Sequence, residues 1–290
     1  MVSIRPAWSF DPATAAAIPT VDLLDTLNVD AVWRHTTGAG VRIAIVDSGI
    51  DNDHPAIAGA VKGWCEPVEH DGSVEFRDAP HGDSCGHGTA CAGIIHGLAP
   101  NAELYSVKVL GADMSGTGVR FAAGLHWAIE HDMHVVNLSL GTTKRDFYAV
   151  LHELADSAYF RRVTLVAAAN NLPANSYPSL YASVISVACQ TDADPWRYCY
   201  NPTPPVEFSA PGIDVRVAWT GGGYVRGTGN SYAAPHITGL VARLLEHWPQ
   251  LTPFQIKTLL RAAAANVRGE LASHDLHLTT SAPQSTPSTP

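Results

Sequence analysis

The chain has 290 residues, of which 46% are hydrophobic and 16% are charged, so it can bury a large core. Its formal net charge is −9 at pH 7 and its basic residues form no stripe, which excludes nucleic acid and anionic membranes as expected partners. No apolar run approaches the roughly 20 residues of a membrane span. Residues 1–20 lack a basic segment followed by a long apolar core, so we expect no signal peptide and a cytoplasmic protein.

The chain contains five cysteines, and an odd count without a signal peptide favours a reducing compartment. Cys189 and Cys199 could still form a disulfide across a loop, so the cysteine pattern alone leaves the redox state open.

Residues 1–37 are expected to form an N-terminal extension, with one or two short helices within 21–35. After it, runs rich in Val and Ile alternate with segments of helical periodicity. The expected buried strands cover residues 41–46, 103–109, 134–140, 163–169, 184–188 and 214–219. The expected helices cover residues 117–131, 146–160, 232–247 and 253–265. Thr252 is expected to cap the last helix, with Pro253 at its first position.

This alternation predicts an α/β fold with three layers, in which helices flank both faces of a mostly parallel sheet. We expect a single domain over residues 38–268 and a C-terminal tail over residues 269–290. The tail ends in the low-complexity stretch "TTSAPQSTPSTP", for which we predict disorder.

Three polar residues are placed where function collects in parallel sheets, outside the carboxyl ends of the strands. Asp47 ends the apolar run 41–46 in "VDSGID". His87 stands between two glycines in "DSCGHGTACAGII", and Ser231 lies in the first turn of a long predicted helix in "GNSYAAPHITG". Each has an ordinary structural explanation when taken alone: a turn aspartate, a structural histidine and an N-cap serine.

Together the three residues fit one chemistry. A serine needs a base to lose its proton near neutral pH, and an imidazole base needs a carboxylate to fix its tautomer and stabilise its charged form. The dipole of the helix that begins near Ser231 favours negative charge developing there.

The blocks "VRIAIVDSGIDNDHP", "GHGTACAG" and "GNSYAAPHITG" resemble the three signature blocks of the subtilisin-like (subtilase) serine proteases, in that family's order. The resemblance implies a subtilisin-like fold and a serine endopeptidase that works through an acyl-enzyme. It assigns Ser231 as nucleophile, His87 as general base and then acid, and Asp47 as the orienting carboxylate. The block "VAAANN" (166–171) makes Asn171 the oxyanion donor, although a slip of one residue would assign Asn170.

The resemblance also implies that a peptide substrate binds as an extended strand between two edges of the cleft. One edge is expected within "LGADMSGTG" (110–118), the other in "NLSLG" (137–141), with a further contribution from the residues before Asn171. The implied substrate-binding residues are Met114, Ser115, Gly116, Ser139, Leu140, Gly141, Ala169 and Asn170. The segment "SYPS" resembles one with a cis peptide bond, which predicts a cis bond between Tyr177 and Pro178.

The chain departs from the family in several places. Ala56 follows "HP" where secreted members have an aspartate for a strong calcium site, so we expect that site to be absent and no cofactor to be bound, while a weaker calcium site stays open. The loop after Asn171 has no carboxylate, which favours a small or apolar residue before the cleaved bond. "AAIPT" (16–20) could lie across the cleft as a pro-segment.

Two other kinds of site remain open from the residues. His81, Cys85, His87 and Cys91 could bind zinc, although their spacing matches no standard module. Cys85 could itself be a nucleophile, but His87 already belongs to the stronger pattern.

A subtilase fold kept as a catalytically silent binding protein is the non-enzyme alternative, and the presence of all four catalytic residues favours the enzyme. Processing of a peptide or leader is one expected role. The sequence does not define the natural substrate or the oligomeric state.

Overall fold

The structure is a computed structural model that describes residues 29–267. Its main sheet has nine strands in the order β3-β2-β4-β1-β5-β6-β7-β9-β8. The strands are β1 (Arg42–Asp47), β2 (Val61–His70), β3 (Ser73–Arg77), β4 (Glu103–Lys108), β5 (Val135–Leu138), β6 (Thr164–Ala168), β7 (Ile185–Gln190), β8 (Cys199–Tyr200) and β9 (Phe208–Pro211). All neighbours pair in parallel except the two edge strands, β3 and β8, which pair antiparallel.

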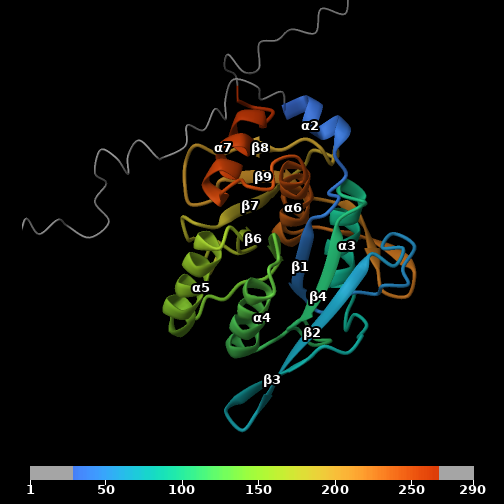
Figure 1. The fold of residues 1–290 in the computed structure, drawn as a ribbon, viewed down its shortest axis with the longest axis vertical. Helices are drawn as coiled ribbons and strands as arrows, with labels where there is room; N and C mark the ends of the chain where they lie inside the picture. The colour runs from blue at the N-terminus through green and yellow to red at the C-terminus, as the bar shows by residue number, and fades with distance from the viewer. Residues whose placement is uncertain (1–28, 268–290) are drawn as a thin grey trace, which may run out of the picture.

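Helices cover both faces of this sheet, as Figure 1 shows. The helical elements are α2 (Val29–His35), α3 (His87–Leu98), α4 (Gly118–Glu130), the 3-10 turn η1 (Arg145–Phe147), α5 (Tyr148–Phe160), α6 (Asn230–His247) and α7 (Pro253–Ala263). Helices α3 and α6 pack on one face, and α4 and α5 on the other. The three-layer, mostly parallel α/β fold predicted from the sequence is therefore confirmed.

Strand β1 shows why an uninterrupted apolar run forms the centre of the sheet. Its side chains alternate between the faces: Ile43 and Ile45 join the core beneath α3 and α6, while Ala44 and Val46 join the core beneath α4 and α5. A strand covered on both faces needs apolar residues at every position. Burial on both sides fixes β1 in place up to its last residue, Asp47.

The strand order reverses at β1. Strand β4 pairs on one side of β1 and β5 on the other, with Asp47 opposite Lys108 and Val46 opposite Leu138. Ligands in open α/β sheets bind at such a reversal, outside the carboxyl ends of the strands. The topology thus places Asp47 and the residues that follow β5 at the expected position of a site.

Some expected elements differ from those observed. The predicted strand 214–219 is β10 (Val215–Trp219), which does not join the parallel sheet. It pairs antiparallel with β11 (Gly223–Gly227) in a separate hairpin on α3. Gly221 and Gly222 both adopt positive φ between the two strands and make the tight turn possible. The sequence analysis also missed β2, β3, β8 and β9, which are short or interrupted by polar residues, glycine or proline.

Helix α7 begins as predicted, with Thr252 in a capping box with Gln255 and Pro253 in the first turn. The Tyr177–Pro178 bond is cis, as predicted. Of the expected helices within 21–35, the described part is α2; the segment 16–20 and the tail 269–290 lie outside the described residues.

All five cysteines are free thiols in the structure. Cys189 on β7 and Cys199 on β8 pair with opposite sides of β9, so two strand spacings of about 4.8 Å each separate them, which is too far for a disulfide.

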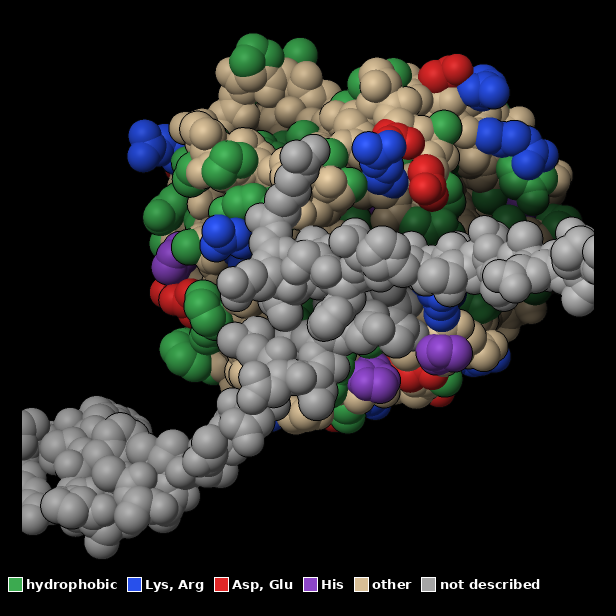
Figure 2. All heavy atoms as spheres, turned by 90° about the horizontal axis from the view of Figure 1, so that it is seen from above, with side chains coloured by type: hydrophobic (Ala, Val, Ile, Leu, Met, Phe, Trp, Pro, Cys, Tyr) green, Lys and Arg blue, Asp and Glu red, His purple; other side chains and the backbone are tan. Residues whose placement is uncertain are grey.

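No helix within residues 29–267 combines the length and hydrophobicity that a membrane crossing requires. On the face seen in Figure 2, the basic side chains lie among acidic and uncharged ones.

Candidate active site

Asp47 is fully buried at the end of β1. Its Oδ1 accepts a hydrogen bond from the backbone N–H of Ser48 at 2.8 Å. The same oxygen lies 2.8 Å from Nδ1 of His87, and Oδ2 lies 3.0 Å from it. Because a carboxylate only accepts, Nδ1 carries the proton, and the second ring nitrogen, Nε2, is left as an acceptor.

His87 is the first residue of α3 and is only 5% exposed. Burial alone would lower the pKa of this imidazole. The charge of Asp47, the hydrogen bond to it and the charge of Asp83 outweigh burial, so the pKa of His87 is raised above its ordinary value. The pair can therefore hold a proton on the imidazole more firmly than a free histidine does.

Asp83 organises the start of α3. Its Oδ1 accepts from the backbone N–H groups of Cys85 and Gly86 and from the Ser48 hydroxyl, and its Oδ2 accepts from the N–H and hydroxyl of Thr89, all at 2.6–3.0 Å. Burial raises the pKa of this carboxyl, but the hydrogen bonds outweigh burial, and the net pKa lies below its usual value. Asp83 thus fixes the turn that presents His87.

The two glycines beside His87 allow other parts of the chain to pack closely against this turn. Gly86 has a φ of 105°, and a Cβ there would lie 2.4 Å from the Trp219 ring. A Cβ on Gly88 would lie 2.0 Å from the carbonyl oxygen of Gly49. Their small size therefore allows the start of α3 to pack closely against β10 and against the loop after β1.

Ser231 lies in the first turn of α6, where backbone N–H groups have no helical partner. Pro235 stands four residues further on and has no N–H to give to the Ser231 carbonyl. That carbonyl accepts instead from the Ser139 hydroxyl at 2.8 Å and from the Cys91 thiol at 3.6 Å. Because of the proline, the start of α6 is held by Ser139, which follows β5, and by Cys91 of α3.

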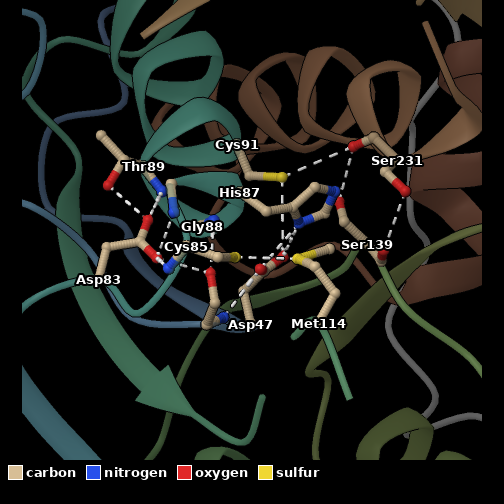
Figure 3. A network of polar contacts seen from close by, with 12 residues as sticks. Asp47, Asp83, Cys85, His87, Gly88, Thr89, Cys91, Met114, Ser139 and Ser231 are labelled. Atoms are coloured by element: carbon tan, nitrogen blue, oxygen red, sulfur yellow. Dashed lines mark hydrogen bonds and ion pairs between the residues drawn. The ribbon is translucent and has the colours of Figure 1, made fainter. Parts of the chain in front are cut away.

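The hydroxyl of Ser231 donates to the backbone oxygen of Ser139 at 3.1 Å. Within the described residues, no hydrogen bond joins it to His87. Figure 3 shows the His87 ring between the Asp47 carboxylate and Ser231. The Cys91 sulfur lies 3.8 Å from Asp47 Oδ2 and 3.6 Å from the carbonyl oxygen of Ser231. The structure brings the three predicted residues into one cluster and links two of them directly.

Asn230, next to Ser231, ties the loop after β6 to α6. Its Nδ2 donates to the carbonyls of Ala169 and Asn170 at 3.1 and 3.0 Å, and its Oδ1 accepts from Cys189 N–H at 2.8 Å. Its own N–H donates to Asn171 Oδ1 at 2.9 Å. Every hydrogen-bonding group of the buried Asn230 amide therefore fixes the neighbourhood of Ser231.

The two adjacent asparagines differ in orientation. Asn171 Oδ1 accepts from the first residue of α6, and its Nδ2 lies near Gly229, two residues before Ser231, with no hydrogen-bond acceptor among residues 29–267. Asn170 Oδ1 accepts instead from Leu172 N–H within its own turn. The geometry favours Asn171 over Asn170 as the amide that serves the site.

The expected substrate segments are also placed around this cluster. Met114 lies beside it, with Sδ 2.9 Å from Cys85 Sγ. Residues 111–115 form a turn closed by Gly111 N–H to the Ser115 carbonyl, so the edge expected within 110–118 forms no strand pairing in the described structure. Ser139, Leu140 and Gly141 directly follow β5, and Ala169 and Asn170 directly follow β6.

The four residues of the zinc alternative do not come together as one group within the described structure. His81 Nε2 lies 2.9 Å from the Ser106 hydroxyl, and Cys85 contacts Met114. Among the described residues, the one group with metal-ligand proximity is Asp47, His87 and Cys91. There Nδ1 of His87 lies within hydrogen-bond distance of Asp47, and burial raises the pKa of the Cys91 thiol well above its ordinary value.

Sequence reasoning missed Asp83, Asn230 and the contact of Ser139 with the Ser231 carbonyl. Pro235, four residues after Ser231, was a readable signal that this carbonyl needs a donor from elsewhere. No comparable signal marked Asp83, whose partners become neighbours only in the folded turn.

Comparisons with known proteins agree with this geometry. A sequence model of the subtilase family matches residues 38–281. An alkaline protease of Alkalihalobacillus alcalophilus is 36% identical over 246 residues, which cover 81% of this chain and 61% of that protein. Subtilisin BL of Lederbergia lenta is 36% identical over the same length, covering 87% of that protein. The chain thus spans less than two thirds of the alkaline protease and most of Subtilisin BL.

Solved structures show the same fold. A cold-adapted subtilisin-like serine proteinase superposes with a TM-score of 0.64 at 27% identity, covering 79% of this chain and 83% of that one. The psychrophilic protease S41 superposes with a TM-score of 0.66 at 27% identity, covering 81% and 88%. By sequence and by fold, this chain belongs to the subtilase family.

Proposed function

We propose that the chain is a serine endopeptidase that hydrolyses peptide bonds through an acyl-enzyme. The observation that carries this proposal is the buried hydrogen bond between Asp47 and His87 Nδ1, next to a serine at the start of α6. This bond leaves His87 Nε2 as an acceptor on the side of Ser231. The family supports the same activity.

In the first step Ser231 Oγ attacks the carbonyl carbon of the substrate while His87 Nε2 takes the hydroxyl proton. The hydroxyl must first turn from the Ser139 carbonyl towards His87. Hydrogen bonds between catalytic groups are commonly long or misaligned without substrate and tighten when it binds. Asp47 stabilises the imidazolium that forms, through the hydrogen bonds to Nδ1.

The negative oxygen of the tetrahedral intermediate is held by the Ser231 N–H and by Asn171 Nδ2. The intermediate then collapses, His87 gives its proton to the departing amine, and the acyl group remains on Ser231. Water, deprotonated by His87, attacks this ester and releases the acid. Removal of the corresponding amide in subtilisin costs about 10²–10³ in kcat, and we expect the same scale for Asn171→Ala.

The proposed substrate is an extended peptide segment. Residues 115–117 and 139–141 flank the catalytic cluster outside the strands of the sheet, where an extended segment could pair with the chain. Since no carboxylate lies in the loop after Asn171, we expect small or apolar side chains before the cleaved bond.

The test is incubation of the purified chain with a peptide library derived from a proteome, with cut sites identified by mass spectrometry. We expect cleavage by the wild type and by the exposed control Ser73→Ala, and none by Ser231→Ala. If the folded wild type cleaves nothing, the protein is instead a subtilase-fold binding protein without catalytic activity.

A further inference from the structure

A cavity of about 250 Å³ lies on the outer side of α3, away from the catalytic cluster. It opens to solvent and is lined by the second half of α3, by the β10–β11 hairpin, by the loop at Pro195 and Trp196, and by His236 of α6. None of Asp47, His87, Ser231 or Asn171 lines it. Pockets for drug-sized ligands have volumes of about 300–1,000 Å³, so this cavity suits a smaller molecule.

The cavity has one deep polar group. His236 is 6% exposed, and its Nδ1 lies 2.9 Å from the carbonyl oxygen of Tyr232. A carbonyl only accepts, so Nδ1 carries the proton and Nε2 holds a free lone pair. Among residues 29–267 no group donates to this Nε2, and the side chain lines the cavity.

This nitrogen is a neutral acceptor at physiological pH. Burial lowers the pKa of His236 to about 4, which the hydrogen bond to the Tyr232 carbonyl only partly offsets. A ligand therefore has to bring a donor to Nε2. A neutral hydroxyl fits this requirement better than an ammonium group, which would lose its hydration in the cavity and face Arg216 at its mouth.

The walls favour a flat, apolar ligand body. Gly97 of α3 leaves open space beside its backbone, Gly93 one turn earlier packs close to Ala218, and Ile94, Leu98 and Val217 provide apolar side chains. At the mouth, Trp196 and Tyr224 are 40% and 42% exposed, and the Arg216 guanidinium lies 3.6 Å from the centre of the Tyr224 ring. Aromatic rings pack well against aromatic side chains and flat surfaces of this kind.

We propose that this cavity is a binding site for a small aromatic alcohol of the phenol class, whose hydroxyl donates to His236 Nε2 and whose ring lies against α3 beside Gly97. The site is independent of the catalytic cluster, so the proposal does not depend on the proposed protease activity.

Gly97 provides a variant that fills the site. It lines the cavity, and a Cβ built on it meets no atom within 4 Å, so a larger side chain at this position begins in open space. Alanine also exceeds glycine in helix propensity, and leucine is close to alanine, so Gly97→Leu should fold. Ala149→Leu is the matched control, because it adds a leucine to the exposed face of another helix, α5.

The experiment is a titration of the full chain with phenol, followed by saturation-transfer NMR, and repeated with toluene. Toluene has the same shape but no donor. We expect saturable binding of phenol, about tenfold weaker binding of toluene because Nε2 stays unpaired, and unchanged binding by Ala149→Leu. Gly97→Leu should weaken phenol binding by at least about tenfold, because the cavity is filled.

Three results would overturn the proposal: no saturable phenol binding by the wild type, equal binding by Gly97→Leu, or toluene binding as tightly as phenol. The first two would show that the cavity is not the site. The last would show that His236 does not select the ligand.

Discussion

The imidazole of His87 has two nitrogens in different environments, and this difference sets how its charge depends on pH. Nδ1 is held by a buried carboxylate, and Nε2 is left to exchange a proton with Ser231. Because the charge and hydrogen bond of Asp47 raise the pKa of His87, the protonated form persists to a higher pH than in a free histidine.

We therefore predict that kcat/KM falls on acidification with an apparent pKa above 6.5, because the base must be neutral to accept the serine proton. Asp47→Asn should lower kcat by about 10⁴, the scale known for this change in serine proteases, and should remove the upward shift of the inflection. The measurement is kcat/KM for a peptide substrate from pH 5 to 9. An inflection below 6.5 in the wild type, or a flat profile, would contradict the role of His87.

The same shift has a consequence for stability. A raised pKa in the folded state means that the folded protein binds the proton more tightly than the unfolded chain does. His87 therefore contributes stability that is fully present below the unfolded pKa of about 6.5 and is lost as the pH rises through the folded pKa.

Asn230 acts on the reaction only through its neighbours, as a positioning residue. Asn230→Ala leaves the Cys189 N–H and the carbonyls of Ala169 and Asn170 without their partner. We predict a loss of about 3 kcal/mol in the free energy of unfolding, because buried polar groups without partners cost about 1–3 kcal/mol each. We also predict a fall in kcat larger than the change in KM, because the loop that carries Asn171 loses the two hydrogen bonds that Asn230 Nδ2 donates to it.

Urea unfolding and peptide hydrolysis measure these two effects. Asn101→Ala is the control, because Asn101 makes a comparable but exposed side-chain hydrogen bond to Thr37. If Asn230→Ala matched this control in both stability and kcat, the positioning role would be excluded.

For individual residues, the sequence predicts those that take part in the reaction but not those that hold them in position. Asp47, His87 and Ser231 could be recognised because each stands in a local context, a strand end or a helix start, that exposes its chemistry. The contacts of Asn230 with Ala169 and Cys189 join segments 61 and 41 residues apart, respectively, so no local pattern reveals them.

Helix α3 is the element that positions the base, and Asp83 is its main anchor. The carboxylate accepts hydrogen bonds from two residues before His87 and from Thr89 after it, so the first turn is held from both sides. Helix α6 has the corresponding role for the nucleophile, with Pro235 shaping its first turn.

We predict that Asp83→Asn lowers the free energy of unfolding by about 2 kcal/mol at pH 7, because an amide nitrogen cannot accept the bonds that one carboxylate oxygen accepts. The depressed pKa of Asp83 gives a stabilisation that is present above the unfolded pKa of about 3.9 and is lost as the pH falls through the folded pKa.

Unfolding measured between pH 3 and pH 7 should therefore show a smaller decrease on acidification for Asp83→Asn than for the wild type. Asp156→Asn, at an exposed position of α5, should follow the wild type throughout. Parallel curves for Asp83→Asn and the wild type would show that Asp83 does not anchor the turn.

Elements with a strong apolar pattern could be predicted from the sequence, and irregular ones could not. The apolar run 41–46 predicts β1, and the Thr-Pro start predicts α7. Strand β2 contains Gly63 and Pro67 and is half-buried, so its pattern is not that of a strand. Strand β10 has a valid strand pattern but joins a hairpin, because the glycines that follow it turn the chain back.

The whole fold brings together three residues that lie far apart in the sequence. Asp47 and His87 are 40 positions apart, and His87 and Ser231 are 144 positions apart. Strand β1 delivers Asp47 at the point where the strand order reverses, and α3 and α6 lie side by side on one face and deliver His87 and Ser231 at their starts. The sequence predicts the layers from the alternation of strands and helices. It does not predict the strand order, which depends on long-range pairing.

The central claim is that Ser231 is a nucleophile because His87 accepts its proton and Asp47 orients and stabilises the His87 imidazole. Its most direct test is reaction of the folded chain with a fluorophosphonate probe, followed by identification of the modified residue by mass spectrometry. We predict a single adduct on Ser231, retained in Ser73→Ala and absent in Ser231→Ala. A folded wild type that carries no adduct, or carries it on another residue, would contradict the claim.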